Sequence, residues 1–86
     1  MEYEYTCKGT CSRTIHFTLS DDDTVSGVSF EGGCNGNLKG IASLTEGQKA
    51  EDVIARLEGL KCGMKPTSCP DQLAQALRAA LKEKAS

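Results

Sequence analysis

The residues in this sequence that could carry chemistry are its cysteines, five in 86 residues. A tetrahedral Zn²⁺ or an iron–sulfur cluster needs three or four thiolates that converge from non-adjacent segments, with backbone amides nearby. Four of the cysteines stand at an expected turn or helix start rather than on an apolar stripe, and we therefore predict that they bind one metal centre. These four are Cys11, Cys34, Cys62 and Cys69.

The expected positions of these cysteines favour thiolates. Cys69 directly precedes Pro70 and is expected at the N-cap of the last helix. Unpaired N–H groups and the positive end of the helix dipole at that position stabilise the thiolate over the thiol. Cys34 precedes another predicted helix start, so we expect similar surroundings for its sulfur. The prediction rests on position, because the sequence contains no Cys-x-x-Cys pair.

Three other features have ordinary explanations. Cys7 is in phase with Tyr3 and Tyr5 on a predicted strand, which is typical of a small buried apolar side chain. His16 alternates out of phase with the apolar residues of its strand, so we expect it to be exposed, and no acid can be placed behind it for a catalytic triad. Asp21–Asp23 is expected to be a solvated turn rather than a Ca²⁺ or Mg²⁺ site, because the ligand spacing of a calcium loop is absent.

The elements that position the cysteines follow from hydrophobic periodicity. Period-two alternation predicts strands over residues 2–8 and 13–19. A third strand contains Val25, Val28 and Phe30, and its phase shifts at Gly27, as a β-bulge would shift it. The first 33 residues are therefore expected to form an antiparallel meander, with Cys11 at the rim of its first hairpin.

Helical spacing predicts three helices after this meander. The first ends at Gly47 and the second stops at Gly59. A loop then extends from Lys61 to Ser68, and the third helix begins at about Pro70. The expected apolar faces are Leu38, Ile41, Ala42 and Leu44 in the first helix, Val53, Ile54 and Leu57 in the second, and Leu73, Ala76, Leu77, Ala80 and Leu81 in the third. The predicted fold is α+β in the order βββααα, with the helices packed on one face of the sheet and residues 1–86 forming one domain.

Composition excludes some classes of function. Ten Lys and Arg against twelve Asp and Glu give a net charge of −2, without the basic excess that a nucleic-acid binder needs. No stretch approaches the roughly 20 apolar residues of a membrane span. The acidic start of the chain has no apolar segment typical of a secretion signal, so we expect a cytoplasmic protein. In that reducing compartment, cysteines are more often metal ligands or catalytic thiols than structural disulfides.

The short length of the chain also indicates that the cysteines contribute to stability. A domain this short removes only about 60 to 65% of its unfolded surface from water, so its core is small. Small domains commonly need a disulfide, a metal or a partner in addition to such a core. The five cysteines are expected to supply part of that extra stability.

Several motifs resemble one family across nearly the whole chain. The string at residues 67–71 reads Thr-Ser-Cys-Pro-Asp. Three further motifs of the same family precede it in the family's order and at compatible spacings, at residues 11–13, 32–38 and 62–66. The sequence resembles the short stand-alone form of the TSCPD domain, which also occurs at the C-terminal end of ribonucleotide reductases, chiefly the cobalamin-dependent class. The resemblance implies a setting in ribonucleotide reduction. The chain itself is too short to form the catalytic barrel of a reductase, and we assign no catalytic residue.

A fainter resemblance is to the U-type iron–sulfur scaffold proteins. Cys11, Cys34 and Cys69 occupy positions relative to the expected strands and helices that are similar to those of the three scaffold cysteines. This resemblance implies a bound cluster or zinc ion. The sequence departs from that pattern in having Arg13 in place of an aspartate and Ser68 in place of a histidine. These departures argue against a labile site, whereas Cys62 could add a fourth thiolate.

Three functions remain open at this stage. The first is a metal-binding accessory domain holding Zn²⁺ or an iron–sulfur cluster, with ribonucleotide reductase or a redox protein as the implied partner. The second is a thiol-redox shuttle, in which Cys69 and either Cys34 or Cys62 pass reducing equivalents to the reductase. The third is a docking module without chemistry. The sequence does not indicate an oligomeric state.

Overall fold

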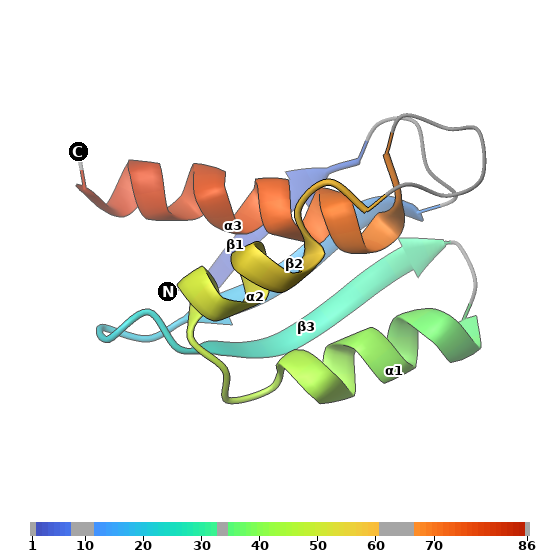
Figure 1. Cartoon of the computed structure of the whole chain (residues 1–86), viewed down its shortest axis with the longest axis horizontal. Coiled ribbons are helices and arrows are strands. Elements are labelled where there is room, and N and C mark those ends of the chain that lie inside the picture. Colours follow the sequence, from blue (N-terminus) through green and yellow to red (C-terminus); the bar gives the residue numbers. More distant parts are fainter. Residues whose placement is uncertain (1, 8–11, 33–34, 61–66, 86) are drawn as a thin grey trace.

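Three antiparallel strands are followed by three helices in a computed structural model that describes residues 2–7, 12–32, 35–60 and 67–85. The predicted α+β class and the order βββααα are confirmed (Figure 1). No helix in this described part of the chain is long and apolar enough to cross a membrane. The strands are β1 (Glu2–Thr6), β2 (Ser12–Leu19) and β3 (Val25–Gly32), and the helices are α1 (Asn35–Thr45), α2 (Ala50–Leu57) and α3 (Cys69–Ala85).

The sheet has the order β1-β2-β3, with β2 in the centre. The alternating side chains Ile15, Phe17 and Leu19 of β2 are all buried, as their period of two predicts. Tyr3 of β1 pairs with Phe17, and their rings stack with centroids 5.5 Å apart. The aromatic side chains of β1 therefore extend the apolar face that β2 begins.

The predicted bulge in β3 is present at Gly27. His16 pairs with Ser29 while Thr18 pairs with Ser26, so β3 contains one extra residue between these pairs. Gly27 has φ +60°, in the left-handed region that favours glycine. Because of the extra residue, Val25 and Val28 both face the core, although they are three positions apart in a strand.

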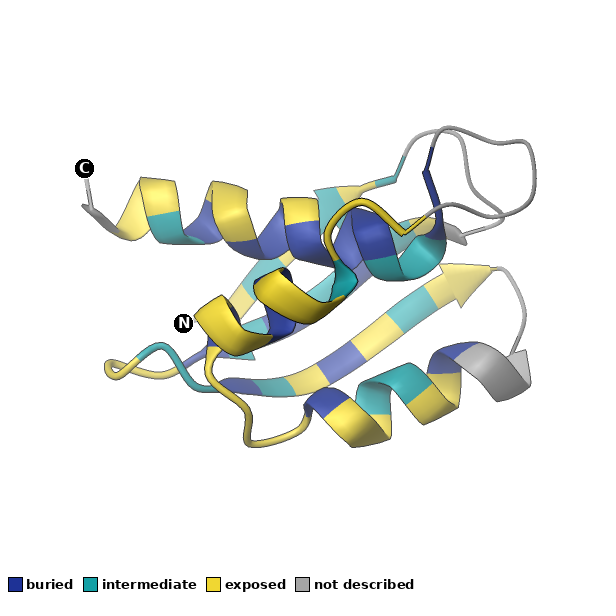
Figure 2. Ribbon diagram, viewed as in Figure 1, coloured by how far each residue is buried: buried dark blue, intermediate teal, exposed yellow. Residues whose placement is uncertain are grey.

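The helices form one layer against this apolar face. Figure 1 shows α2 and α3 lying across the sheet and α1 running alongside β3, and Figure 2 shows their buried positions turned inward. The helices contribute eight buried side chains to the core cluster: Ala50, Val53, Ile54, Leu73, Ala74, Ala76, Leu77 and Ala80. Six of these eight are predicted core positions, and Ala50 and Ala74 are additional. The predicted Leu57 and Leu81 are partly buried and pack against the cluster.

One predicted core residue in α1 is wrong. Helical spacing places Leu44 on the apolar face of the helix, but the residue is 79% exposed. The inward face follows Leu38, Ile41 and Thr45, which keep the three- and four-residue spacing of a helix. Thr45 can be buried because its hydroxyl donates to the carbonyl oxygen of Ile41 at 2.9 Å.

Glycines end α1 and α2 where the sequence predicts. Gly47 and Gly59 follow the last turns at φ +79° and +85°, conformations that stop a helix at little cost for glycine. The segment after α1 then joins the sheet, because Val25 donates its N–H to Gln48 and accepts one from Gly47, both at 2.8 Å. The connection between α1 and α2 is therefore fixed to the start of β3.

Candidate metal centre

Of the four predicted metal ligands, the structure describes Cys69. Cys11, Cys34 and Cys62 lie outside the described residues, and their prediction stays untested. Cys69 is the first residue of α3, and it is half-buried. Within the described ranges, no group of three or more His, Cys, Asp or Glu side chains is placed to hold a metal ion.

The described neighbours of the predicted ligands lie at one end of the molecule. Ser12 at the start of β2 pairs with Gly32 at the end of β3. Figure 1 shows the end of β3, the start of α1 and the start of α3 toward the same end of the long axis. Along the chain, Cys11 directly precedes Ser12 and Cys34 directly precedes Asn35.

The start of α3 differs from the prediction by one residue, because Ser68 rather than Cys69 is the N-cap. The Ser68 Oγ accepts the N–H of Asp71 at 3.2 Å, and the Ser68 carbonyl oxygen accepts the N–H of Gln72 at 2.8 Å. Pro70 has no N–H to offer. The expectation of unpaired amides facing Cys69 is therefore wrong for Asp71 and Gln72, whose N–H groups are already bonded.

A buried carboxylate organises the same turn. Asp71 is only 5% exposed, and its Oδ1 accepts the N–H of Gly59 at 2.7 Å. Its Oδ2 accepts the Thr67 hydroxyl and the side-chain amide of Gln75, the latter at 2.8 Å. Burial raises the pKa of Asp71, but the hydrogen bonds from Thr67, Gly59 and Gln75 together hold it below its usual range.

These contacts connect the end of α2 to the start of α3. The Ser68 hydroxyl donates to the carbonyl oxygen of Leu60 at 2.7 Å, so two consecutive residues after α2 are bonded to the first turn of α3. We call the group formed by Gly59, Leu60, Thr67, Ser68 and Asp71 the α2–α3 clasp. Sequence reasoning missed it, although the Ser-x-x-Asp spacing is close to that of a capping box.

Cys7 lies just after β1 and is half-buried rather than buried. Its side chain packs against the core cluster, as predicted for a small apolar residue. Its N–H donates to the carbonyl oxygen of Arg13 at 2.8 Å, which continues the β1–β2 pairing by one residue. These contacts support a structural role for Cys7.

His16 lies on the face of the sheet away from the core. Its side chain is 39% exposed, with Nε2 3.4 Å from Glu31 Oε2 and Nδ1 3.9 Å from Glu4 Oε2. The two carboxylates flank the imidazole from opposite strands and do not converge on one nitrogen. This arrangement fits the expected surface histidine.

The three aspartates of the β2–β3 turn have lysine partners. Lys49 Nζ lies 3.1 Å from Asp22 Oδ2, and Lys84 Nζ lies 2.6 Å from Asp23 Oδ1 and 3.4 Å from the Asp21 carbonyl oxygen. Hydrogen bonds from Ser20 and then Lys49 hold the pKa of Asp22 well below its usual range. The turn is thus tied to the start of α2 and the end of α3.

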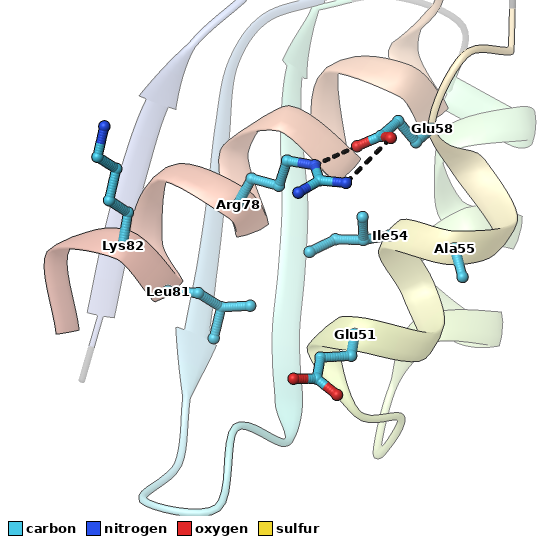
Figure 3. Close-up of a pocket in the computed structure, with 7 residues that line it drawn as sticks. All are labelled: Glu51, Ile54, Ala55, Glu58, Arg78, Leu81 and Lys82. Atoms are coloured by element: carbon cyan, nitrogen blue, oxygen red, sulfur yellow. Dashed lines mark hydrogen bonds and ion pairs between the residues drawn. The ribbon is translucent and has the colours of Figure 1, made fainter. Parts of the chain in front are cut away.

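A groove of about 560 Å³ lies between α2 and α3 (Figure 3). Its apolar lining is Ile54, Ala55 and Leu81, and at one end Arg78 forms a two-point ion pair with Glu58. Arg78 follows Cys69 by nine residues, which is about 13 Å along a helix. Arg78 therefore lies more than two turns beyond Cys69, whereas Glu58 directly precedes Gly59 of the α2–α3 clasp.

Comparison with known proteins gives one match. The sequence model of the TSCPD domain family matches residues 1–81, a range that covers the strands, α1, α2 and most of α3. No curated protein and no solved structure matches the chain.

Proposed function

The chain belongs to the TSCPD domain family, and we propose that it is a small metal-binding accessory domain. In this proposal Cys11, Cys34, Cys62 and Cys69 bind one Zn²⁺ or one iron–sulfur cluster. The observation that carries it is that α3, which begins with Cys69, starts at the same end of the molecule as α1 and as the end of β3, where Gly32 pairs with Ser12. In the sequence, Cys11 directly precedes Ser12 and Cys34 directly precedes Asn35, the first residue of α1. Ligands of one metal must share such an end, because each sulfur lies about 2.3 Å from the ion.

The α2–α3 clasp supports the inclusion of Cys62. Leu60 precedes Cys62 by two residues, and its carbonyl oxygen is bonded to Ser68, the neighbour of Cys69. Two extended residues span only about 7 Å. Leu60, the last described residue before Cys62, is therefore in contact with the residue next to Cys69.

The chemistry of the described ligand suits a structural centre. Cys69 is half-buried at the first position of the 17-residue helix α3. When bound by four thiolates, a Zn²⁺ ion has no open position and supplies folding free energy rather than catalysis. A small core with many alanines has much to gain from such a cross-link.

The wider setting of the proposal comes from resemblance. A cytoplasmic location would keep the thiols reduced and available to a metal. Ribonucleotide reduction is the process in which related domains occur, and a reductase or one of its redox partners is the proposed binding partner.

A thiol-redox shuttle is the second candidate, and the partial exposure of Cys69 is the observation in its favour. A buried thiol could not exchange with a partner disulfide, whereas a half-buried thiol at a helix start can. The two candidates differ in what they require of the thiols, because bound metal blocks exchange.

Cobalt substitution tests the metal proposal against this alternative. Four thiolates around Co²⁺ should give intense visible absorption and sulfur-to-metal charge transfer, with saturation at one equivalent per chain. Cys69→Ser should weaken the charge-transfer band, and Cys7→Ser should leave it unchanged. A chain that gives only the spectrum of hydrated Co²⁺, and whose thiols form a disulfide at a potential near that of the cell, would favour the shuttle.

A further inference from the structure

Leu44 is an apolar side chain that the fold leaves outside. It lies in the last turn of α1 and is 79% exposed, compared with 46% for Leu60. Leu44 also lines a groove of about 360 Å³ between α1 and α2, whose other walls are Thr45, Gln48, Asp52, Val53, Arg56 and Leu57. One exposed leucine is ordinary on a protein surface. An exposed leucine beside a groove that Val53 and Leu57 help to line has a shape that can fit a second copy of the same face.

The charges beside this groove are arranged in the same self-complementary way. Asp52 and Arg56 are both exposed and stand one helical turn apart on α2. In the described part of the chain, neither side chain has an ion pair. The neighbouring charged residues are engaged elsewhere, because Glu46 accepts the N–H of Gly27 and Lys49 pairs with Asp22.

We propose that the surface formed by Leu44, the groove beside it, Asp52 and Arg56 binds a second copy of the chain across a twofold axis. We call this surface the Leu44 face. A twofold axis perpendicular to α2 and midway between Asp52 and Arg56 places the two α2 helices antiparallel, so Asp52 of each copy faces Arg56 of the other. Leu44 of each copy then enters the groove of its partner. The Leu44 face is complementary to itself for two reasons. It has an exposed leucine beside a groove, and it has one acidic and one basic side chain one helical turn apart.

The Leu44 face is independent of the proposed metal centre. Leu44 follows Asn35 by nine residues along α1, which is about 13 Å of helix. The proposed dimer therefore leaves the cysteine-bearing end of each copy exposed. A contact of this small size is expected to be weak, with dimers forming at micromolar or higher concentration.

Sedimentation equilibrium of the full chain in reducing buffer tests the proposal, over concentrations from about 1 µM to about 1 mM, the range that brackets a weak dimer. The wild-type chain should show a monomer–dimer equilibrium. Leu44→Ala should raise the dissociation constant about 100-fold, because two leucine side chains leave the interface. Leu60→Ala is the matched control and should leave the dissociation constant unchanged, because Leu60 does not line the groove.

Charge exchange gives a test that loss of stability cannot imitate. Asp52→Arg and Arg56→Asp, each alone, should weaken the dimer about 10-fold, because like charges then face each other twice. A mixture of these two variants should form heterodimers of wild-type strength, since every facing pair is again opposite in charge. A wild-type chain that stays monomeric to 1 mM would overturn the proposal. So would a dimer indifferent to Leu44→Ala, or failure of the mixture to restore association.

Discussion

Replacing Asp71 with alanine should be among the most destabilising changes in the chain outside the apolar core. The carboxylate accepts the Gly59 N–H, the Thr67 hydroxyl and the Gln75 amide. Gln75 and Gly59 are exposed and can bond to water, whereas the buried hydroxyl of Thr67 loses this acceptor. A buried donor without its acceptor costs about 1 to 3 kcal/mol, so the free energy of unfolding should fall by about 1 to 3 kcal/mol. For a domain of this size that is about 4 to 24 °C in Tm.

The pH dependence of this loss carries a definite sign. The pKa of Asp71 is lowered in the folded chain, so the stability that it contributes is fully present above the unfolded pKa of about 3.9. That contribution is lost as the pH falls through the lower, folded pKa. The difference between wild type and Asp71→Ala should therefore be constant near neutral pH and narrow below about pH 4.

Urea unfolding followed by circular dichroism measures both effects. Wild type and Asp71→Ala should differ in midpoint with similar m-values, since the same surface unfolds. Glu83→Ala is the matched control, because Glu83 is an exposed carboxylate on the same helix and should change stability by no more than about 0.5 kcal/mol. A cost for Asp71→Ala no larger than that of Glu83→Ala would refute the assignment of Asp71 to a clasp with a buried donor.

Further substitutions test the N-cap, the bulge and the proposed metal centre. Ser68→Ala removes the N-cap and the bond to Leu60, and should lower the free energy of unfolding by about 1 to 2 kcal/mol in urea titration; no loss would contradict the N-cap assignment. Gly27→Val places a β-branched residue at φ +60° and should lower Tm, whereas an unchanged Tm would argue against the bulge. In the metal-loaded protein, Cys69→Ser and Cys34→Ser should each lower Tm by many degrees, and the double variant should be no worse, because one missing ligand already abolishes the site; additive losses would favour a docking module. Cys7→Ser should cost only about 1 to 2 kcal/mol by the same melting assay.

The fold could be read from the sequence because its signals are local. The alternation of Ile15, Phe17 and Leu19 requires a strand with one buried face, and the three-residue gap between Val25 and Val28 requires a bulge at the glycine between them. The prediction for Leu44 is wrong because its position lies within one turn of the buried residues of α1, so its apolar side chain fits the same helical pattern. The buried position went instead to Thr45, whose hydroxyl is satisfied by its own helix.

The clasp could not be predicted because its bonds join distant parts of the chain. Asp71 reads as an ordinary first-turn acid, and nothing in the sequence indicates that Gly59 donates to it across twelve positions. The lysine partners of the aspartate turn are similar, since Lys84 is about sixty residues from Asp23 in sequence. For the candidate metal centre, Cys69 stands beside its predicted position, and the predictions for Cys11, Cys34 and Cys62 remain predictions.

The most direct test of the central claim is the metal content of the chain, purified anaerobically under reducing conditions without added metal and measured by mass spectrometry. The account predicts about one Zn²⁺, or the iron and acid-labile sulfide of one cluster, per chain, as the four thiolates of one centre require. That content should be lost in Cys69→Ser and retained in Cys7→Ser. A wild-type chain that contains no metal, and that takes up none when Zn²⁺ or Fe²⁺ with sulfide is supplied, would contradict the proposed metal centre.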